Sequence, residues 1–84
     1  MLDKNSTTSL FLQIEADIKN NIDNGVYIAG DKLPTEIELM EFYNVSRITI
    51  RRAIDDLTKE GILIKKQGKG TFIKEKKIQR KIPN

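Results

Sequence analysis

The stretch NVSRITIRRAI, residues 44–54, constrains the fold more than any other part of this sequence. It sets three arginines among three isoleucines and a valine, and no acidic residue interrupts it. When residues 47–60 are laid out as a helix with a step of about 100°, one side is apolar: Ile50, Ala53, Ile54 and Leu57. The side away from it carries Ile48, Arg51, Arg52 and Asp55, with Arg47 and Thr49 on the flanks. One side of the helix is therefore predicted to pack a core and the other to meet a partner.

A shorter helix is predicted just before it, over residues 36–43, and we expect it to bury Leu39, Met40 and either Phe42 or Tyr43. Thr35 and Glu38 have the spacing of a capping box, in which each side chain bonds to the other residue's backbone N–H. Residues 44–45 then make a tight break, because asparagine tolerates the left-handed backbone conformation, and Ser46 can cap the following helix. Two helices joined by so short a turn are typical of a helix-turn-helix.

An amphipathic helix is predicted over residues 9–24, because apolar residues recur there at three- and four-residue steps: Leu10, Phe11, Ile14, Ile18 and Ile22. Ser9 is a candidate N-cap and Gly25 a candidate stop. The opposite side is predicted to face solvent and carries Glu15, Asp17, Lys19 and Asn20.

Two β-branched runs, ILIKK (62–66) and TFIKE (71–75), flank a turn at residues 67–70 and predict a β-hairpin. Earlier in the chain, Lys32 and Leu33 can form at most a brief extended piece, because Pro34 follows. The predicted class is α+β, a winged helix-turn-helix of three helices with a C-terminal β-hairpin wing. The predicted core contains Leu10, Ile14, Ile18, Ile22, Leu39, Ile50, Ile54, Leu57 and Phe72.

Composition excludes several classes of function. The 84 residues make one small domain without cysteine or histidine, which excludes disulfides and thiolate or imidazole metal sites. No apolar run approaches a membrane span, and the polar first residues lack the apolar region of a signal peptide, so we expect a cytoplasmic protein without membrane contact. No serine or threonine has an evident base, so we expect no enzyme activity and no cofactor in this chain.

Charge is distributed unevenly along the chain. Residues 1–46 hold three Lys or Arg against eight Asp or Glu, a balance of −5, whereas residues 47–84 hold twelve against four, a balance of +8. A basic half of this kind indicates contact with a polyanion, either nucleic acid or a membrane surface. Charge alone does not choose between the two.

The start of the third helix suits DNA. A recognition helix enters the major groove with its N-terminal residues nearest the base edges, and the arginine fork matches guanine O6 and N7. Arg47 and Arg51 lie one turn apart on the helix. Thr49 can donate to phosphate or touch a thymine methyl, and Ser46 can offer its amide region to a phosphate. Ile48 suits a groove wall or a base methyl.

An alternative interpretation makes the arginines structural. Arg51 with Asp55, and Arg52 with Asp56, have the i,i+4 spacing of ordinary ion pairs. This alternative carries most weight for Arg52.

A second basic motif, KKQGKGT at residues 65–71, forms the predicted hairpin tip. Gly68 and Gly70 permit turn conformations that other residues avoid, and they let the backbone approach a ligand closely. The flanking lysines could reach a phosphate-rich groove, or they could simply protect the edge of a solvated hairpin. A nucleotide-binding P-loop is excluded, because Lys69 is followed by glycine and not by serine or threonine.

The order LPTEIEL … NVSRITIRRAIDDLTKEGIL … KKQGKGTFI resembles the DNA-binding domain of the GntR family of bacterial transcription regulators. The recognition segment and the wing both match the family pattern. The resemblance implies a repressor-like protein whose recognition helix (47–60) reads a half-site of a palindromic operator, with the wing (65–71) in the adjacent minor groove. The implied contacts are Ser46, Arg47, Thr49, Arg51 and Gly68. At Ile37 the family usually has an arginine that contacts DNA, so affinity or the bases read are expected to differ.

The resemblance also implies an organisation. Residues 1–8 are predicted to be a disordered N-terminus, 9–74 the DNA-binding domain, and 75–84 a basic linker. The linker is expected to lead to an effector domain outside this chain, which binds a small molecule and makes the dimer. The LFLQI opening resembles the HutC branch, whose effector domains often take sugar phosphates or other small metabolites. We expect the isolated chain to be monomeric without DNA and to place two copies on a palindromic operator.

All candidate DNA contacts together are Thr35, Ser46, Arg47, Ile48, Thr49, Arg51, Arg52, Lys66, Gln67, Gly68, Lys69, Gly70 and Thr71. A protein–protein interaction module is the alternative function, because winged helices also serve as scaffolds. Such a module does not need arginines around a groove-sized face. An RNA binder would need exposed aromatic residues for stacking, and the five aromatics fall mostly at core-like positions.

Overall fold

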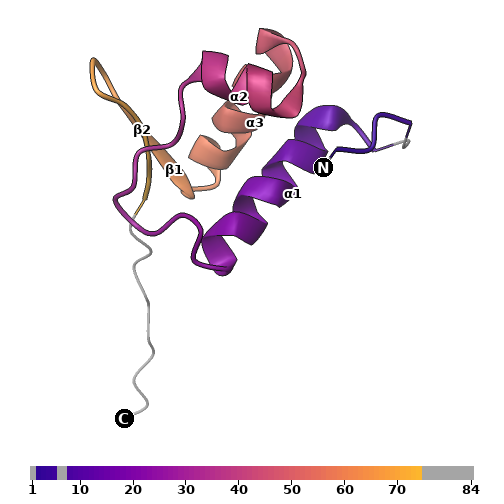
Figure 1. The fold of residues 1–84 in the computed structure, drawn as a ribbon. Coiled ribbons are helices and arrows are strands. Elements are labelled where there is room, and N and C mark those ends of the chain that lie inside the picture. The colour runs from indigo at the N-terminus through magenta and orange to yellow at the C-terminus, as the bar shows by residue number, and fades with distance from the viewer. Residues whose placement is uncertain (1, 6–7, 75–84) are drawn as a thin grey trace.

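The computed structural model describes residues 2–5 and 8–74. It contains three helices, α1 (Leu10–Asp23), α2 (Glu36–Tyr43) and α3 (Arg47–Lys59), followed by the strands β1 (Leu63–Lys66) and β2 (Gly70–Ile73) (Figure 1). The predicted α+β class, with three helices and a C-terminal hairpin, is confirmed. The predicted tail, residues 75–84, lies outside the described residues.

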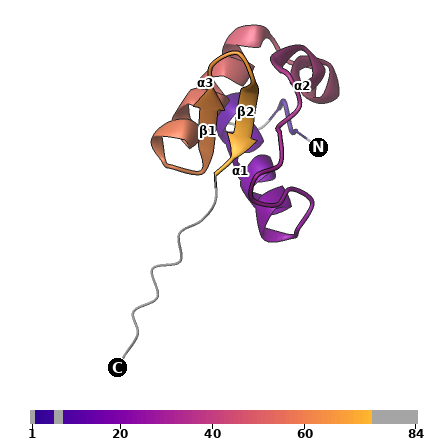
Figure 2. The same cartoon turned by 90° about the vertical axis from the view of Figure 1, so that its left-hand side faces the viewer.

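Helix α3 is the centre of the domain, because it packs against α1, α2 and β1. It lies between α1 on one side and the hairpin on the other (Figure 1). Figure 2 shows the hairpin in front of the helices, with its turn pointing towards the end of the molecule where α2 and the start of α3 lie. In the part of the chain that is described, no helix is long and apolar enough to cross a membrane.

Local chemistry fixes the helix-turn-helix. The capping box of α2 is present: Thr35 Oγ1 accepts from the Glu38 N–H at 3.1 Å, and the Glu38 carboxylate accepts from the Thr35 N–H at 2.8 Å. Asn44 adopts the left-handed conformation (φ 56°, ψ 56°), and its N–H donates to the Met40 carbonyl. Ser46 then caps α3 through Thr49 N–H at 3.4 Å. All three of these local predictions are confirmed.

The first helix begins and ends close to the predicted residues, but one cap differs. The Ser9 side chain makes no capping hydrogen bond; its main-chain carbonyl accepts from Leu12 and Gln13 N–H at 3.1 Å each. Gly25 follows the helix with φ +81°, as expected of a residue that stops a helix.

The core forms where α1, α2, α3 and the hairpin meet. Ile14, Ile18, Leu39, Ile50, Ile54 and Leu57 are buried as predicted. The prediction was wrong for Leu10, Ile22 and Phe72, which are only half-buried. Ala53, on the predicted apolar side of α3, is buried as well, and of the two aromatic residues of α2 Tyr43 is the buried one. Leu33, Leu63 and Ile73 lie in the core without having been predicted there.

Strand register explains the error at Phe72. Leu63 pairs with Ile73, and Ile64 pairs with Phe72. Because successive side chains of a strand point to opposite faces, the first pair faces the core and the second faces outward. The periodicity of two short strands leaves this choice of face open, and packing against α3 decides it.

A third short segment holds the hairpin to the body. Lys32 forms an isolated antiparallel bridge with Phe72, which is the brief extended piece expected before Pro34. The Leu33 N–H donates to the Thr71 carbonyl at 2.8 Å, and the Ile73 N–H donates to the Asp31 carbonyl at 2.9 Å. This segment therefore covers one edge of β2, and its Leu33 side chain is buried in the core.

The residues before α1 make defined contacts. Leu2 packs against the core as a partly buried side chain. The Asp3 N–H donates to Gln13 Oε1 at 2.7 Å, and Lys4 Nζ donates to the carbonyl of Asn44 in the helix-turn-helix turn. The part of the N-terminus that is described therefore lies between α1 and that turn.

Candidate nucleic-acid interface

The start of α3 is an exposed, basic surface beside a packed core. Ile50 on its inner side is 0% exposed, whereas Ile48, two residues earlier, is 80% exposed. Arg47 and Arg51 also have exposed side chains. The two predicted sides of this helix are confirmed.

Glu36, the first residue of α2, reaches both of these arginines. Its Oε1 lies 3.4 Å from Arg47 Nε, and its Oε2 lies 3.7 Å from Arg51 Nε. One carboxylate thus gathers two guanidinium groups by contacts at Nε, the nitrogen nearest the main chain. The sequence reasoning missed this role of Glu36. The available signal was an acid beside the capping residue Thr35, at a helix start that a helix-turn-helix brings close to the second helix.

The alternative interpretation, in which the arginines form i,i+4 ion pairs, has a different outcome for Arg51 than for Arg52. The Arg51 contact is to Glu36, and Asp55 contacts Lys65 Nζ from β1 at 2.5 Å. This bond holds the pKa of Asp55 below its usual value.

Arg52 does have the expected i,i+4 partner, because its Nε lies 3.5 Å from Asp56 Oδ2. Its guanidinium carbon also lies 4.1 Å from the centre of the Phe11 ring of α1. Arg52 is therefore held by two structural partners, a position unlike that of Arg47 and Arg51.

The hairpin tip presents the second basic motif. Lys66, Gln67, Gly68, Lys69 and Gly70 are exposed, and Thr71 is half-buried. The turn closes through the Lys69 N–H, which donates to the Lys66 carbonyl at 2.8 Å. Both glycines are required by conformation, since φ is +78° at Gly68 and +120° at Gly70. A Cβ at Gly70 would also come within 2.7 Å of the Lys32 side chain.

The tip and the start of α3 lie at the same end of the molecule (Figures 1 and 2). The structure thus brings together at one end two motifs that are about twenty residues apart in sequence. Thr35 also lies in this region, but its side-chain oxygen is used in the capping box of α2.

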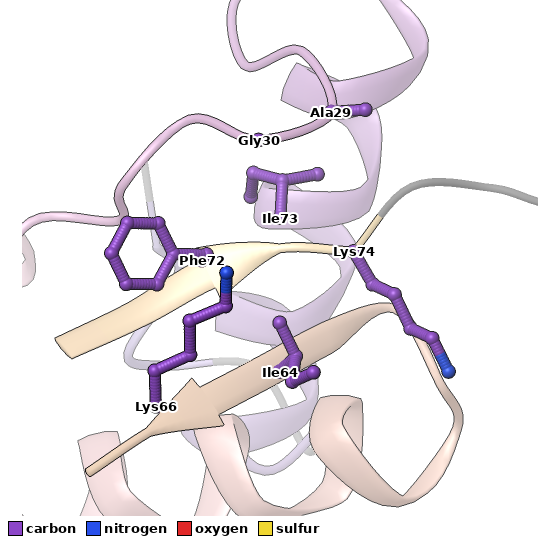
Figure 3. Close-up of a pocket in the computed structure, with 7 residues that line it drawn as sticks. All are labelled: Ala29, Gly30, Ile64, Lys66, Phe72, Ile73 and Lys74. Carbon is purple, nitrogen blue, oxygen red and sulfur yellow. The ribbon is translucent and has the colours of Figure 1, made fainter. Parts of the chain in front are cut away.

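Two hollows lie elsewhere on the domain, and one of them is bordered by Lys66 of the hairpin. One is on the outer face of the hairpin, between Gly30, Ile64 and Phe72, where Lys66 Nζ lies 5.0 Å from the centre of the Phe72 ring (Figure 3). The other lies between the end of α1 and the end of α3 and is lined by Ile22, Tyr27 and Ile62, among others. Neither includes the arginines. Within residues 2–5 and 8–74, no group of three or more acidic residues could hold a metal ion.

One acidic side chain is buried where solvent exposure was predicted. Glu15 of α1 is only 5% exposed, because it faces α3, and its Oε2 has no hydrogen-bond partner. Burial, a hydrogen bond with Asp56, and the charges of Asp56 and Glu60 raise the pKa of Glu15 to about 7, against a smaller opposing effect of Lys19. The prediction of a wet surface was wrong because α3 packs across this part of α1 as well as across its apolar stripe.

A hydrogen bond between side chains joins α1 to α2. The Tyr43 hydroxyl donates to Asp17 Oδ2 at 2.6 Å. Burial, followed by this bond and the Asp17 charge, raises the pKa of Tyr43 far above its usual value. Tyr43 therefore stays protonated and holds α2 against α1.

Comparison with known proteins places this arrangement in a family. The family model described as "Bacterial regulatory proteins, gntR family" matches residues 10–73. The chain is 52% identical, over 82 residues, to the "Uncharacterized HTH-type transcriptional regulator YurK" of Bacillus subtilis, covering 98% of this chain and 34% of that protein. It is 48% identical, over 77 residues, to the "Probable fructoselysine utilization operon transcriptional repressor" of Escherichia coli K12, covering 92% of this chain and 32% of the relative.

Solved structures agree with the sequence relatives. The AraR DNA-binding domain in complex with operator ORX1 matches with a TM-score of 0.77 and 40% identity, covering 86% of each chain. YtrA from Sulfolobus acidocaldarius, described as a GntR-family transcription factor, matches with a TM-score of 0.85 and 30% identity, covering 92% of this chain and 81% of the other.

The fold is therefore the winged helix-turn-helix of a DNA-binding domain, and the relatives are transcription regulators and not enzymes. The chain belongs to the GntR family of bacterial regulatory proteins. It spans about a third of the length of the curated relatives it matches.

Proposed function

We propose that this chain binds double-stranded operator DNA sequence-specifically, as the DNA-binding domain of a bacterial transcription regulator that acts as a repressor. The observation that carries the proposal is the pair Arg47 and Arg51, held together by Glu36 at the exposed start of α3. Support comes from the AraR domain, which has the same fold and was solved on its operator.

The recognition helix would read the major groove of one half-site. Both Arg47 and Arg51 lie within ion-pair distance of Glu36, so their guanidinium groups lie near one carboxylate, and the arginine fork matches guanine O6 and N7. Ser46 and Thr49 stand at the helix start, where exposed N–H groups and hydroxyls suit phosphate. Thr35 would contact phosphate at the neighbouring start of α2. Arg52 is the weakest of the proposed contacts, because Asp56 and Phe11 already hold it.

The wing would enter the adjacent minor groove. Its proposed contacts are Lys66, Gln67, Gly68, Lys69, Gly70 and Thr71. The two glycines have positive φ and present bare backbone at the tip, and backbone without side chains can approach sugar and phosphate closely. The lysines would neutralise phosphates whatever the sequence.

We infer the assembly and the cellular setting from the same proposal. Residues 9–74 would be the DNA-binding domain, 1–8 an N-terminal arm, and 75–84 a linker to an effector domain that binds a small molecule in the intact regulator. The isolated chain would be a monomer in the cytoplasm and place two copies on a palindromic operator. Residues 9–74 alone would bind more weakly than two such domains linked in one dimer, because linked modules gain effective concentration.

A selection from randomised duplexes, followed by a base-pair panel, tests the function. We expect enrichment of a sequence with guanines at fixed positions. On that operator, Arg47→Ala and Arg51→Ala should each cost about 1–3 kcal/mol and relax discrimination at one base pair. Arg47→Lys should not restore it, because lysine keeps the charge and loses the planar fork.

Lys59→Ala is the matched control, since it removes one positive charge from the far end of the same helix. It should change affinity much less than either arginine variant. Equal losses on operator and random DNA for Arg47→Ala and Arg51→Ala would mean that these arginines contact phosphates only. A pool in which no sequence is enriched would refute sequence-specific binding and favour the interaction-module alternative.

A further inference from the structure

Two large aliphatic side chains are exposed at positions that follow directly, in sequence, the two residues of the Glu36–Arg47 ion pair. Ile37 directly follows Glu36 in the first turn of α2 and is 56% exposed; Ile48 directly follows Arg47 in the first turn of α3 and is 80% exposed. Since the Glu36 carboxylate contacts Arg47, each isoleucine is the chain neighbour of one member of the same ion pair. Ile48 has the greatest exposure of the exposed large apolar residues in the described part of the chain.

Neither isoleucine is explained by folding. Neither belongs to the buried core or to the partly buried residues packed against it. Isoleucine is also a weaker helix former than the lysine or glutamate usual on an exposed helical position, because its branched side chain loses χ1 freedom. Single exposed apolar residues are common on protein surfaces. Here, however, one lies in the first turn of α3, which carries Arg47 and Arg51, and the other lies in the first turn of α2, whose Glu36 contacts both arginines. This placement indicates a partner with apolar groups at that place.

The major groove offers such a group. Among the base edges exposed there, only thymine carries a methyl group, at C5, beside hydrogen-bonding atoms. We propose that Ile48 and Ile37 each contact a thymine methyl next to the guanines read by Arg47 and Arg51. This inference rests on the proposed function and adds the second base that the site recognises.

The two positions should contribute unequally. Ile48 is on the recognition helix itself and is the more exposed residue, whereas Ile37 is on α2, which lies behind it in a helix-turn-helix. A branched side chain with one preferred χ1 in a helix holds its methyl groups in a fixed place, which suits recognition of a fixed group. We therefore expect a strong thymine preference opposite Ile48 and a weaker one opposite Ile37.

Replacing single thymines of the selected operator by deoxyuridine isolates the methyl group, because base pairing and charge are unchanged. Burying one methyl-sized group is worth about 0.8 kcal/mol, so loss of the methyl opposite Ile48 should weaken binding roughly fourfold. With Ile48→Ala, that same substitution should make no difference. Ile37→Ala should remove the sensitivity at a different thymine.

Ile28→Ala serves as the control, since this residue is 60% exposed in the loop between α1 and α2, away from the arginines. It should leave every deoxyuridine effect unchanged. All three variants alter exposed side chains, so folding is expected to survive each of them.

Each result bears on the inference. A deoxyuridine effect that disappears only in the matching isoleucine variant supports it. An operator that tolerates deoxyuridine at every position, or an effect that persists in both alanine variants, overturns it while leaving the proposed function intact. A pool that enriches no sequence overturns both.

Discussion

The two sides of α3 differ in what they contact, although they share one short helix. Ile50, Ala53 and Leu57 are wholly buried against the other elements, whereas Ile48 and Arg51 stand in solvent within the same two turns. The buried side contributes free energy of folding through apolar area and packing. The exposed side contributes little to folding and is available to DNA. Substitutions on the buried side of α3 should therefore lower the stability of the fold. Substitutions on its exposed side should lower DNA binding and change stability little.

One polar residue of α1, Glu15, is buried against α3. Glu15 projects from α1 towards α3, close to Asp56 and Glu60. A carboxyl group in that position is tolerated mainly in its protonated form, because burial and neighbouring negative charges disfavour the ionised form. The α1–α3 interface thus contains buried apolar side chains together with one carboxyl group whose ionisation disfavours the folded state.

The largest effect is expected from emptying the buried side. Ile50→Ala should destabilise the fold by about 2–5 kcal/mol, since it removes buried methylenes and leaves a cavity. Ile48→Ala is the matched control, because it makes the same chemical change on the exposed side of the same turn. Urea unfolding measures both. If the two variants lost similar stability, the contrast between the sides of α3 would be wrong.

The next effect comes from Glu15. Its folded pKa of about 7 lies above the ordinary value of 4.5, so between these values the folded state binds a proton that the unfolded state has lost. Stability must then fall as pH rises from about 4.5 to 7, and level off above that range. The size should be on the order of 1–3 kcal/mol.

Urea unfolding at pH 5 and at pH 7.5 tests this expectation. Glu15→Gln cannot ionise, so this part of the pH dependence should disappear in the variant. The lowered pKa of Asp55 changes stability in the opposite direction and at lower pH, so it contributes little to the change between pH 5 and pH 7.5. A wild-type protein that is as stable at pH 7.5 as at pH 5 would contradict the buried position of Glu15.

A smaller effect is expected at the border between the two sides. Arg52 contacts Asp56 and the Phe11 ring, so Arg52→Ala should cost about 1 kcal/mol of stability or less, from one ion pair and one cation–π contact. Operator binding should fall less than in Arg51→Ala. Measuring stability and operator affinity in Arg52→Ala and Arg51→Ala decides whether Arg52 acts mainly in folding or in DNA binding. A larger loss of operator binding than of stability would assign Arg52 to the DNA surface.

The smallest effect, and the one that extends the comparison to the wing, concerns Lys69. Its exposed position at the hairpin tip makes it a phosphate contact in the proposed function. Lys69→Ala should weaken binding to operator and random duplexes alike and reduce the slope of log affinity against log salt by about 0.9. Titrations at several salt concentrations measure this slope. A loss confined to the operator would make Lys69 a reader of bases.

Much of the fold could be predicted because its determinants are local in sequence. The capping box at Thr35, the left-handed Asn44 and the cap at Ser46 depend on residues three or four positions away. The apolar side of α3 follows from helical periodicity alone. These contacts form between near neighbours whatever the rest of the chain does, so the sequence predicts them.

The errors concern contacts between elements. Phe72 was predicted in the core and Ile73 was not, because the face of a two-stranded hairpin depends on what it packs against. Glu15 was predicted in solvent, because its burial depends on where α3 crosses α1.

The candidate site likewise has local features that the sequence predicts and contacts between elements that it does not. By itself, the sequence determined the helix that carries Arg47 and Arg51, the side they occupy and the glycine-rich tip of the wing. Only the tertiary structure decided that Glu36 gathers both arginines and that the wing tip stands at the same end as the start of α3. The physical reason is that an ion pair or a shared surface requires two segments at a set distance and orientation. Those quantities depend on how α2, α3 and the hairpin pack around one core, and not on any single stretch of residues.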